Sequence, residues 1–167
     1  MPLPAIASGP TSVWQVMAVT WALVIGGWDL YKRRIPNVLT FGAVAVAAIW
    51  LAMTGASPLG ASAGSVLSGI GFGLLVTLPG YFTRKLGAGD VKLLLAIALL
   101  GGIVPTLVSF VVGALLAGAV AVVWLMFGSR FGWPPSGGKV LPFGAALALG
   151  FVVAVIGSQF GGIPWWY

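Results

Sequence analysis

Long uncharged apolar segments, separated by short basic clusters, constrain this chain more than any other feature. Hydrophobic residues make up 60% of the 167 residues and charged residues only 6%, whereas soluble proteins carry about 25% charged residues. So little charge cannot cover a surface that faces water, and the sequence therefore predicts an integral membrane protein. The apolar runs at 38–53 and 103–127 do not alternate with polar residues as strands of a membrane barrel would, so the predicted spans are helices.

The hydropathy pattern divides the chain into about six such helices within a single all-α transmembrane domain over residues 1–167. A helix needs about 20 apolar residues to cross a bilayer, and the fourth predicted span is shorter than that. The predicted spans are 12–31, 38–54, 63–82, 90–102, 104–127 and 142–160.

The basic residues lie in or beside the segments that follow the first, third and fifth predicted spans. They are Lys32, Arg33, Arg34, Arg84, Lys85, Lys92, Arg130 and Lys139. Basic residues accumulate on the cytoplasmic side of a membrane, so these segments are predicted to be cytoplasmic and both termini non-cytoplasmic. The net charge of +6 then reflects topology and contact with membrane lipid, and we expect no nucleic-acid partner. The first ten residues contain no basic side chain and do not resemble the start of a signal peptide.

The chain contains no cysteine and no histidine. This composition excludes a disulfide framework, a thiol nucleophile, histidine acid–base chemistry and the usual zinc sites built from these residues. We therefore expect neither a metal ion nor another cofactor.

Two aspartates, Asp29 and Asp90, are the only acidic residues in the chain. Each lies at the predicted cytoplasmic end of a span, where an acid is costly and usually functional. Each also has an ordinary structural explanation, since Asp29 could pair with Lys32 or Arg33 along a helix and Asp90 could cap the fourth span. Their shared depth in the membrane favours a joint role over two separate ones.

Two carboxylates in contact cannot easily both ionise, so they share a proton and titrate as a pair. Aspartic proteases use this arrangement: one carboxylate takes a proton from water while the other polarises the peptide carbonyl. Gly87 and Gly89 precede Asp90 and would let a substrate backbone approach it closely. The two aspartates are therefore candidates for peptide hydrolysis.

Three motifs around these aspartates resemble the type IV prepilin peptidases, a family of G-x-G-D intramembrane aspartyl proteases. Residues 87–90 read Gly-Ala-Gly-Asp and continue into Val-Lys-Leu, with the lysine at Lys92. Asp29 is followed at 34–37 by Arg-Ile-Pro-Asn, which is similar to the first-aspartate region of the family. Residues 142–144, Pro-Phe-Gly, resemble the element before the last helix of the family.

The resemblance implies an enzyme that removes short basic leaders from prepilins or pseudopilins at the cytoplasmic face of the bacterial inner membrane, commonly after a glycine. It implies that Asp29 and Asp90 are the catalytic pair. Residues of the three motifs would shape the site: Gly87, Gly89, Lys92, Pro36, Asn37, Pro142, Phe143 and Gly144. Pro36 and Pro142 also suit the first turns of the second and sixth spans.

Many bacterial members carry a cysteine-containing region and also methylate the new N-terminus. Since this chain has no cysteine, we expect peptidase activity without methyltransferase activity. The chain resembles the short peptidases of tight-adherence (Flp-type) pilus systems, and archaeal preflagellin peptidases are similarly short.

Two other classes of function remain open from the sequence. A small proton-coupled transporter or channel could use Asp29 and Asp90 as a relay, although the halves of the chain show no inverted repeat of the kind many transporters have. A non-catalytic membrane assembly factor would tolerate loss of either aspartate.

Overall fold

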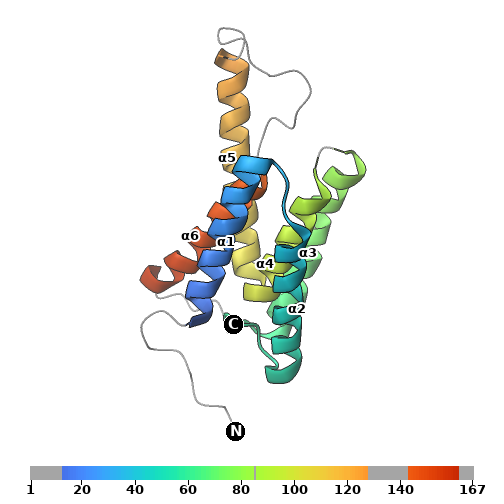
Figure 1. Cartoon of the computed structure of the whole chain (residues 1–167), viewed down its shortest axis with the longest axis vertical. Helices are drawn as coiled ribbons and strands as arrows, with labels where there is room; N and C mark the ends of the chain where they lie inside the picture. Colours follow the sequence, from blue (N-terminus) through green and yellow to red (C-terminus); the bar gives the residue numbers. More distant parts are fainter. Residues whose placement is uncertain (1–12, 85, 128–142, 162–167) are drawn as a thin grey trace.

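The protein is all-helical in the part of the chain that the structure describes, residues 13–84, 86–127 and 143–161 of a computed structural model (Figure 1). Its helices begin and end close to the predicted bounds. They are α1 (Val13–Lys32), α2 (Asn37–Thr54), α3 (Ala63–Phe82), α4 (Ala88–Gly101), α5 (Ile103–Phe127) and α6 (Phe143–Gly161). The prediction of an all-α fold is therefore confirmed.

Four of these helices, α1, α2, α3 and α5, are long and apolar enough to cross a membrane. α4 has 14 residues and rises about 21 Å, less than the roughly 30 Å hydrocarbon core of a bilayer. α6 is also apolar but shorter than a full span between Phe143 and Ser158. The chain is a membrane protein, and six complete spans with both termini outside the cytoplasm remain a prediction.

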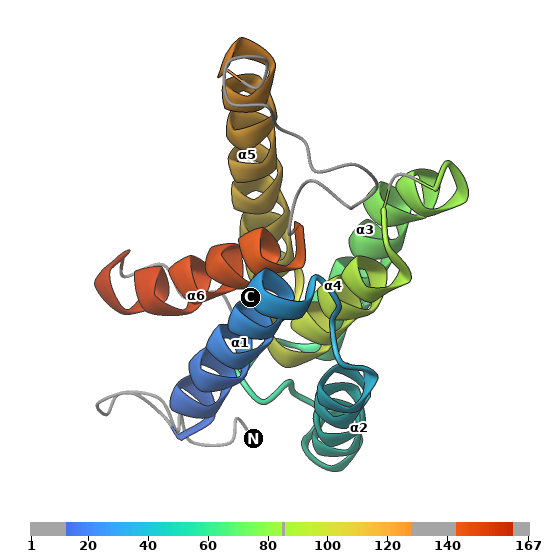
Figure 2. The ribbon, with the colours of Figure 1, turned by 45° about the horizontal axis from the view of Figure 1, so that its top comes forward.

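Helix α4 lies in the middle of the bundle, where it packs against α2, α3, α5 and α6 (Figure 2). Most of its residues are buried, and those along one side, such as Leu95 and Leu99, are half-buried. The buried residues of α4 are Asp90, Leu93, Leu94, Ala96, Ile97, Ala98, Leu100 and Gly101. This central position explains how so short a helix is accommodated, since neighbouring helices shield it from lipid.

The outer helices expose large apolar side chains. In α5, Leu115 is 68% exposed and Leu125 75% exposed. Such surfaces are unfavourable in water but match hydrocarbon chains of a bilayer. The helices meet at small residues instead: a methyl group added at Gly69 would lie 3.0 Å from the backbone of Gly102, which is the close helix contact typical of membrane proteins.

The ends of α1 and α3 and the beginnings of α2, α4 and α6 gather on one side of the bundle, towards the top of Figure 1 but below the end of α5. We call this the aspartate end, because Asp29 lies in the last turn of α1 and Asp90 in the first turn of α4. The opposite end contains the connection between α2 and α3 and the junction of α4 with α5 at Gly102.

Candidate active site

Asp29 is buried at the aspartate end, with 5% of its surface exposed. Its Oδ2 accepts a hydrogen bond of 2.9 Å from the backbone N–H of Ala145, near the start of α6. The first N–H groups of a helix have no partner within the helix, so Asp29 supplies one from α1. The carboxylate thereby joins two helices whose contact residues are 116 positions apart in sequence.

Gly144 leaves the space that this carboxylate occupies. A methyl group added there would lie 2.9 Å from Oδ2 of Asp29 and 2.6 Å from Cδ1 of Ile35. Both distances are below those of ordinary van der Waals contact, so a side chain at this position would require both neighbours to shift. Gly144 therefore shapes the surroundings of Asp29 by its lack of a side chain.

Asp90 is also buried, with 8% of its surface exposed, at the third position of α4. Its Oδ2 accepts a 3.0 Å hydrogen bond from the N–H of Gly87, and its own N–H donates to the carbonyl oxygen of Gly87 over 3.1 Å. This is the carboxylate half of a capping box, so the structural alternative considered for Asp90, a contact at the start of its helix, is present. Each aspartate thus contacts the first turn of a different helix.

Ile35 lies between these two helix beginnings. Its Cδ1 approaches Gly144 on α6, and a methyl group added at Gly89 on α4 would lie 3.2 Å from its Cβ. Since Gly89 directly precedes Asp90, and Gly144 touches the Asp29 carboxylate, one aliphatic side chain contacts the backbone beside both acids. Ile35 therefore connects the two parts of the candidate site.

Asn37 and Lys92 connect α2 with α4 at the same end of the bundle. The Lys92 Nζ donates a 3.2 Å hydrogen bond to Oδ1 of Asn37 and lies 4.8 Å from the ring centre of Phe41. Pro36 precedes α2 in an extended conformation with φ of −65°, as expected of a residue that starts a helix. The pairing holds the segment that contains Ile35 against the beginning of α4.

The structure brings most of the predicted site residues to one end of the bundle. Gly87 and Gly89 adjoin Asp90, Gly144 adjoins Asp29, and Phe143 begins α6. Pro142 lies outside the described residues. Within the described ranges, no group of three or more metal-ligating side chains could hold a metal ion.

Two residues at the site, Ile35 and Ala145, were not singled out from the sequence. Ile35 appeared there only as part of the Arg-Ile-Pro-Asn motif at 34–37. The position of Ala145 in the first turn of the sixth predicted helix was an available signal, because an N–H there needs an external acceptor. Nothing in the sequence indicated that the acceptor is Asp29.

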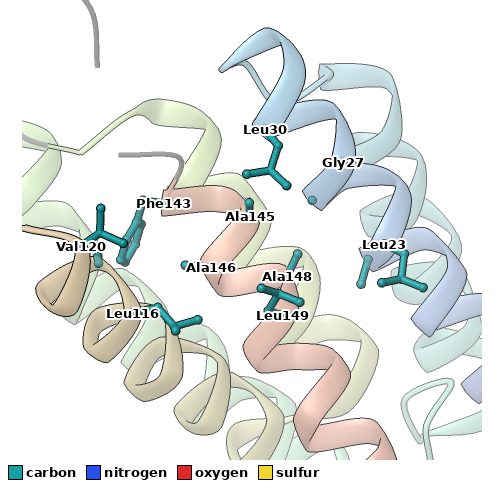
Figure 3. Close-up of a pocket in the computed structure, with 13 residues that line it drawn as sticks. Leu23, Gly27, Leu30, Leu116, Val120, Phe143, Ala145, Ala146, Ala148 and Leu149 are labelled. Carbon is teal, nitrogen blue, oxygen red and sulfur yellow. The ribbon is translucent and has the colours of Figure 1, made fainter. Parts of the chain in front are cut away.

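An apolar groove of about 430 Å³ runs between α1, α5 and α6 (Figure 3). Leu30 in α1 and Ala145 in α6 line it, the first adjacent to Asp29 in sequence and the second bonded to its carboxylate. Several further lining positions are small, among them Gly26, Gly27 and Ala146. The groove therefore offers an apolar surface, without polar side chains, that includes two neighbours of Asp29.

The type IV leader peptidase family model matches residues 16–123, which include both aspartates and all of α4. The chain belongs to this family. The membership makes the protein a membrane peptidase of the leader-peptidase type, an assignment that agrees with its apolar helices. The matched range ends before α6, so the contact of Asp29 with Ala145 is a feature of this structure beyond that range. Searches of curated proteins and of solved structures give no match.

Proposed function

We propose that this family member is an aspartic endopeptidase in which Asp29 and Asp90 together hydrolyse one peptide bond. The observation that carries the proposal is the burial of both carboxylates at the beginnings of two helices that Ile35 bridges. Buried acids in a membrane protein are costly and are usually kept for function. No histidine or cysteine is present in the sequence to act as a base or nucleophile instead.

The reaction proposed for the pair is direct attack by water. One carboxylate accepts a proton from water as the oxygen bonds to the peptide carbonyl carbon, and the other, protonated, donates a hydrogen bond to the carbonyl oxygen. The C–N bond then breaks, and the leaving amine takes a proton from a carboxyl group. One water molecule is consumed, and the products are a carboxylate and a free amine. The proposal covers peptide hydrolysis alone.

The substrates we propose are prepilins or pseudopilins, cut at the cytoplasmic face of the bacterial inner membrane. The family supports a leader-bearing substrate. The basic residues beside the aspartate end, among them Lys32 and Arg84, support a cytoplasmic orientation of the site. The groove beside Asp29 supports a substrate whose apolar segment lies against α1 and α6 while its leader reaches the acids.

A cleavage assay in liposomes tests the proposal. Purified protein is mixed with full-length prepilins, and the product is detected by a mass shift equal to the leader. Asp29→Asn and Asp90→Asn are expected to lower the cleavage rate by at least about 100-fold, the usual contribution of an acid–base group. Each asparagine still offers an oxygen to the N–H of Ala145 or Gly87, so the helix contacts and the thermal midpoint should change little.

The same assay tests the groove with Gly27→Leu. Gly27 lines the groove, and the Cβ of a side chain there would have no neighbour from another element within 4 Å. The leucine should raise KM for a full-length substrate about tenfold but leave cleavage of a soluble leader peptide unchanged. Gly71→Leu, at a second open helix position, is the matched control.

Cleavage that survives either aspartate substitution would refute the catalytic pair.

A further inference from the structure

The Ile35 side chain is held in place from both directions along the chain. On the α1 side, the Arg33 N–H donates a 2.8 Å hydrogen bond to the Asp29 carbonyl oxygen, which fixes the end of the helix. On the α2 side, Pro36 restricts the backbone, and Asn37 is bonded to Lys92 of α4. Ile35 therefore occupies a defined position between the beginnings of α4 and α6.

The half-buried Ile35 side chain fills the space beside two glycines. A single methyl group at Gly144 would come within 2.6 Å of Cδ1 of Ile35, and one at Gly89 within 3.2 Å of its Cβ. These two glycines adjoin the two aspartates, so the crowding occurs beside both acids. Under the proposed function, the substrate residue next to the scissile bond lies beside Ile35.

We propose that Ile35 is a specificity-determining residue that limits the size of the substrate side chain next to the scissile bond. The inference rests on the proposed function, because it assumes that the bond is cleaved between Asp29 and Asp90. A residue with little or no side chain fits beside Ile35, whereas a branched or long one collides with it. Shortening Ile35 should therefore widen the range of leaders that the enzyme cleaves.

Leu59 provides a matched comparison for Ile35. It is also an aliphatic residue in a connecting segment, and its Cδ1 would lie 3.3 Å from a methyl group added at Gly101, at the far end of α4. A merely structural contribution of such a side chain would be lost in both Ile35→Ala and Leu59→Ala. Only the Ile35 variant should change the preference between substrates.

The experiment measures kcat/KM for wild type, Ile35→Val, Ile35→Ala and Leu59→Ala. One series of otherwise identical leader substrates carries Gly, Ala, Val or Leu on the carbonyl side of the scissile bond, and a second series carries them on the amine side. Wild type should prefer the smallest residue in at least one series. In that series, Ile35→Ala should raise the ratio of kcat/KM for the leucine substrate to kcat/KM for the glycine substrate. We expect a rise of about tenfold, the usual effect of one or two methylene groups in a pocket.

Ile35→Val should give an intermediate ratio, and it tests the inference if the alanine variant does not fold. The Leu59→Ala ratio should equal that of wild type. Unchanged ratios in both series for both Ile35 variants would overturn the inference while leaving the peptidase proposal intact. Failure of wild type to cleave any of the substrates would instead contradict the proposed function and the inference with it.

Discussion

The two ends of α4 have similar packing contacts, but they differ in the side chains that accept hydrogen bonds from backbone N–H groups. At each end a glycine faces an aliphatic side chain from a connecting segment: Gly89 faces Ile35, and Gly101 faces Leu59. At the opposite end the acceptor is neutral, because Oγ of Ser65 accepts from the N–H of Ile103 over 3.2 Å. At the aspartate end the acceptors are the carboxylates of Asp90 and Asp29.

This difference indicates that helix capping alone does not explain the two acids. Ser62 caps α3 through a 3.3 Å hydrogen bond from the Ser65 N–H, so a hydroxyl is sufficient to start a helix in this protein. A buried carboxylate is much more costly in a membrane than a hydroxyl. Burial of the two carboxylates therefore costs free energy at the aspartate end that the hydroxyl at the opposite end does not. Such a cost is expected of a catalytic site.

The largest expected contrast between the ends comes from adding one methyl group at each. Gly89→Ala presses on Ile35 beside Asp90, so kcat/KM should fall about tenfold with little change in the thermal midpoint. Gly101→Ala presses on Pro105, whose Cγ would lie 2.8 Å away, and overpacking of this kind costs about 1–3 kcal/mol of stability. Cleavage rates and thermal midpoints of the two variants in the same detergent measure the contrast.

Gly42→Ala serves as the control for this comparison, because a side chain at Gly42 would meet nothing within 4 Å. It should leave both activity and stability unchanged. Equal losses of kcat/KM in the Gly89 and Gly101 variants would show that the two ends do not differ in function.

A smaller effect is expected from the bond that ties α2 to α4. Asn37→Ala removes the acceptor for Lys92, and since exposed contacts of a charged group contribute about 0.2–1 kcal/mol, kcat/KM should fall by at most about fivefold. Asn37→Asp keeps an acceptor for Lys92 and should retain more activity. If the aspartate variant loses as much as the alanine variant, the hydrogen bond is not what positions the segment. The backbone bond from the Leu59 N–H to the Leu100 carbonyl oxygen ties the opposite end and should be unaffected.

Much of this arrangement could be predicted from the sequence, because it depends on local patterns. Apolar runs define the six helices, and Gly87 with Asp90 forms a contact within one helical turn. The contact between Asp29 and Ala145 could not be predicted, since it joins residues from opposite ends of the chain through the packing of α1 on α6. The contacts of Ile35 were missed for the same reason: an isoleucine beside a proline shows nothing of the two glycines that it faces in the fold.

Chemical cross-linking tests the central claim, that Asp29 and Asp90 form one site, most directly. The chain contains no cysteine, so Asp29→Cys combined with Asp90→Cys introduces the only two thiols. A short bifunctional thiol reagent is applied in liposomes, with and without a substrate peptide that cannot be cleaved. The control pairs Asp29→Cys with Thr54→Cys at the end of α2, and a mixture of the two single aspartate variants detects links between molecules.

We predict a cross-link within one molecule for the 29/90 pair, increased by the substrate peptide, and none for the 29/54 pair or for the mixture. If both thiols at 29 and 90 react with a monofunctional reagent but never become linked, even with substrate present, the two aspartates do not form one site.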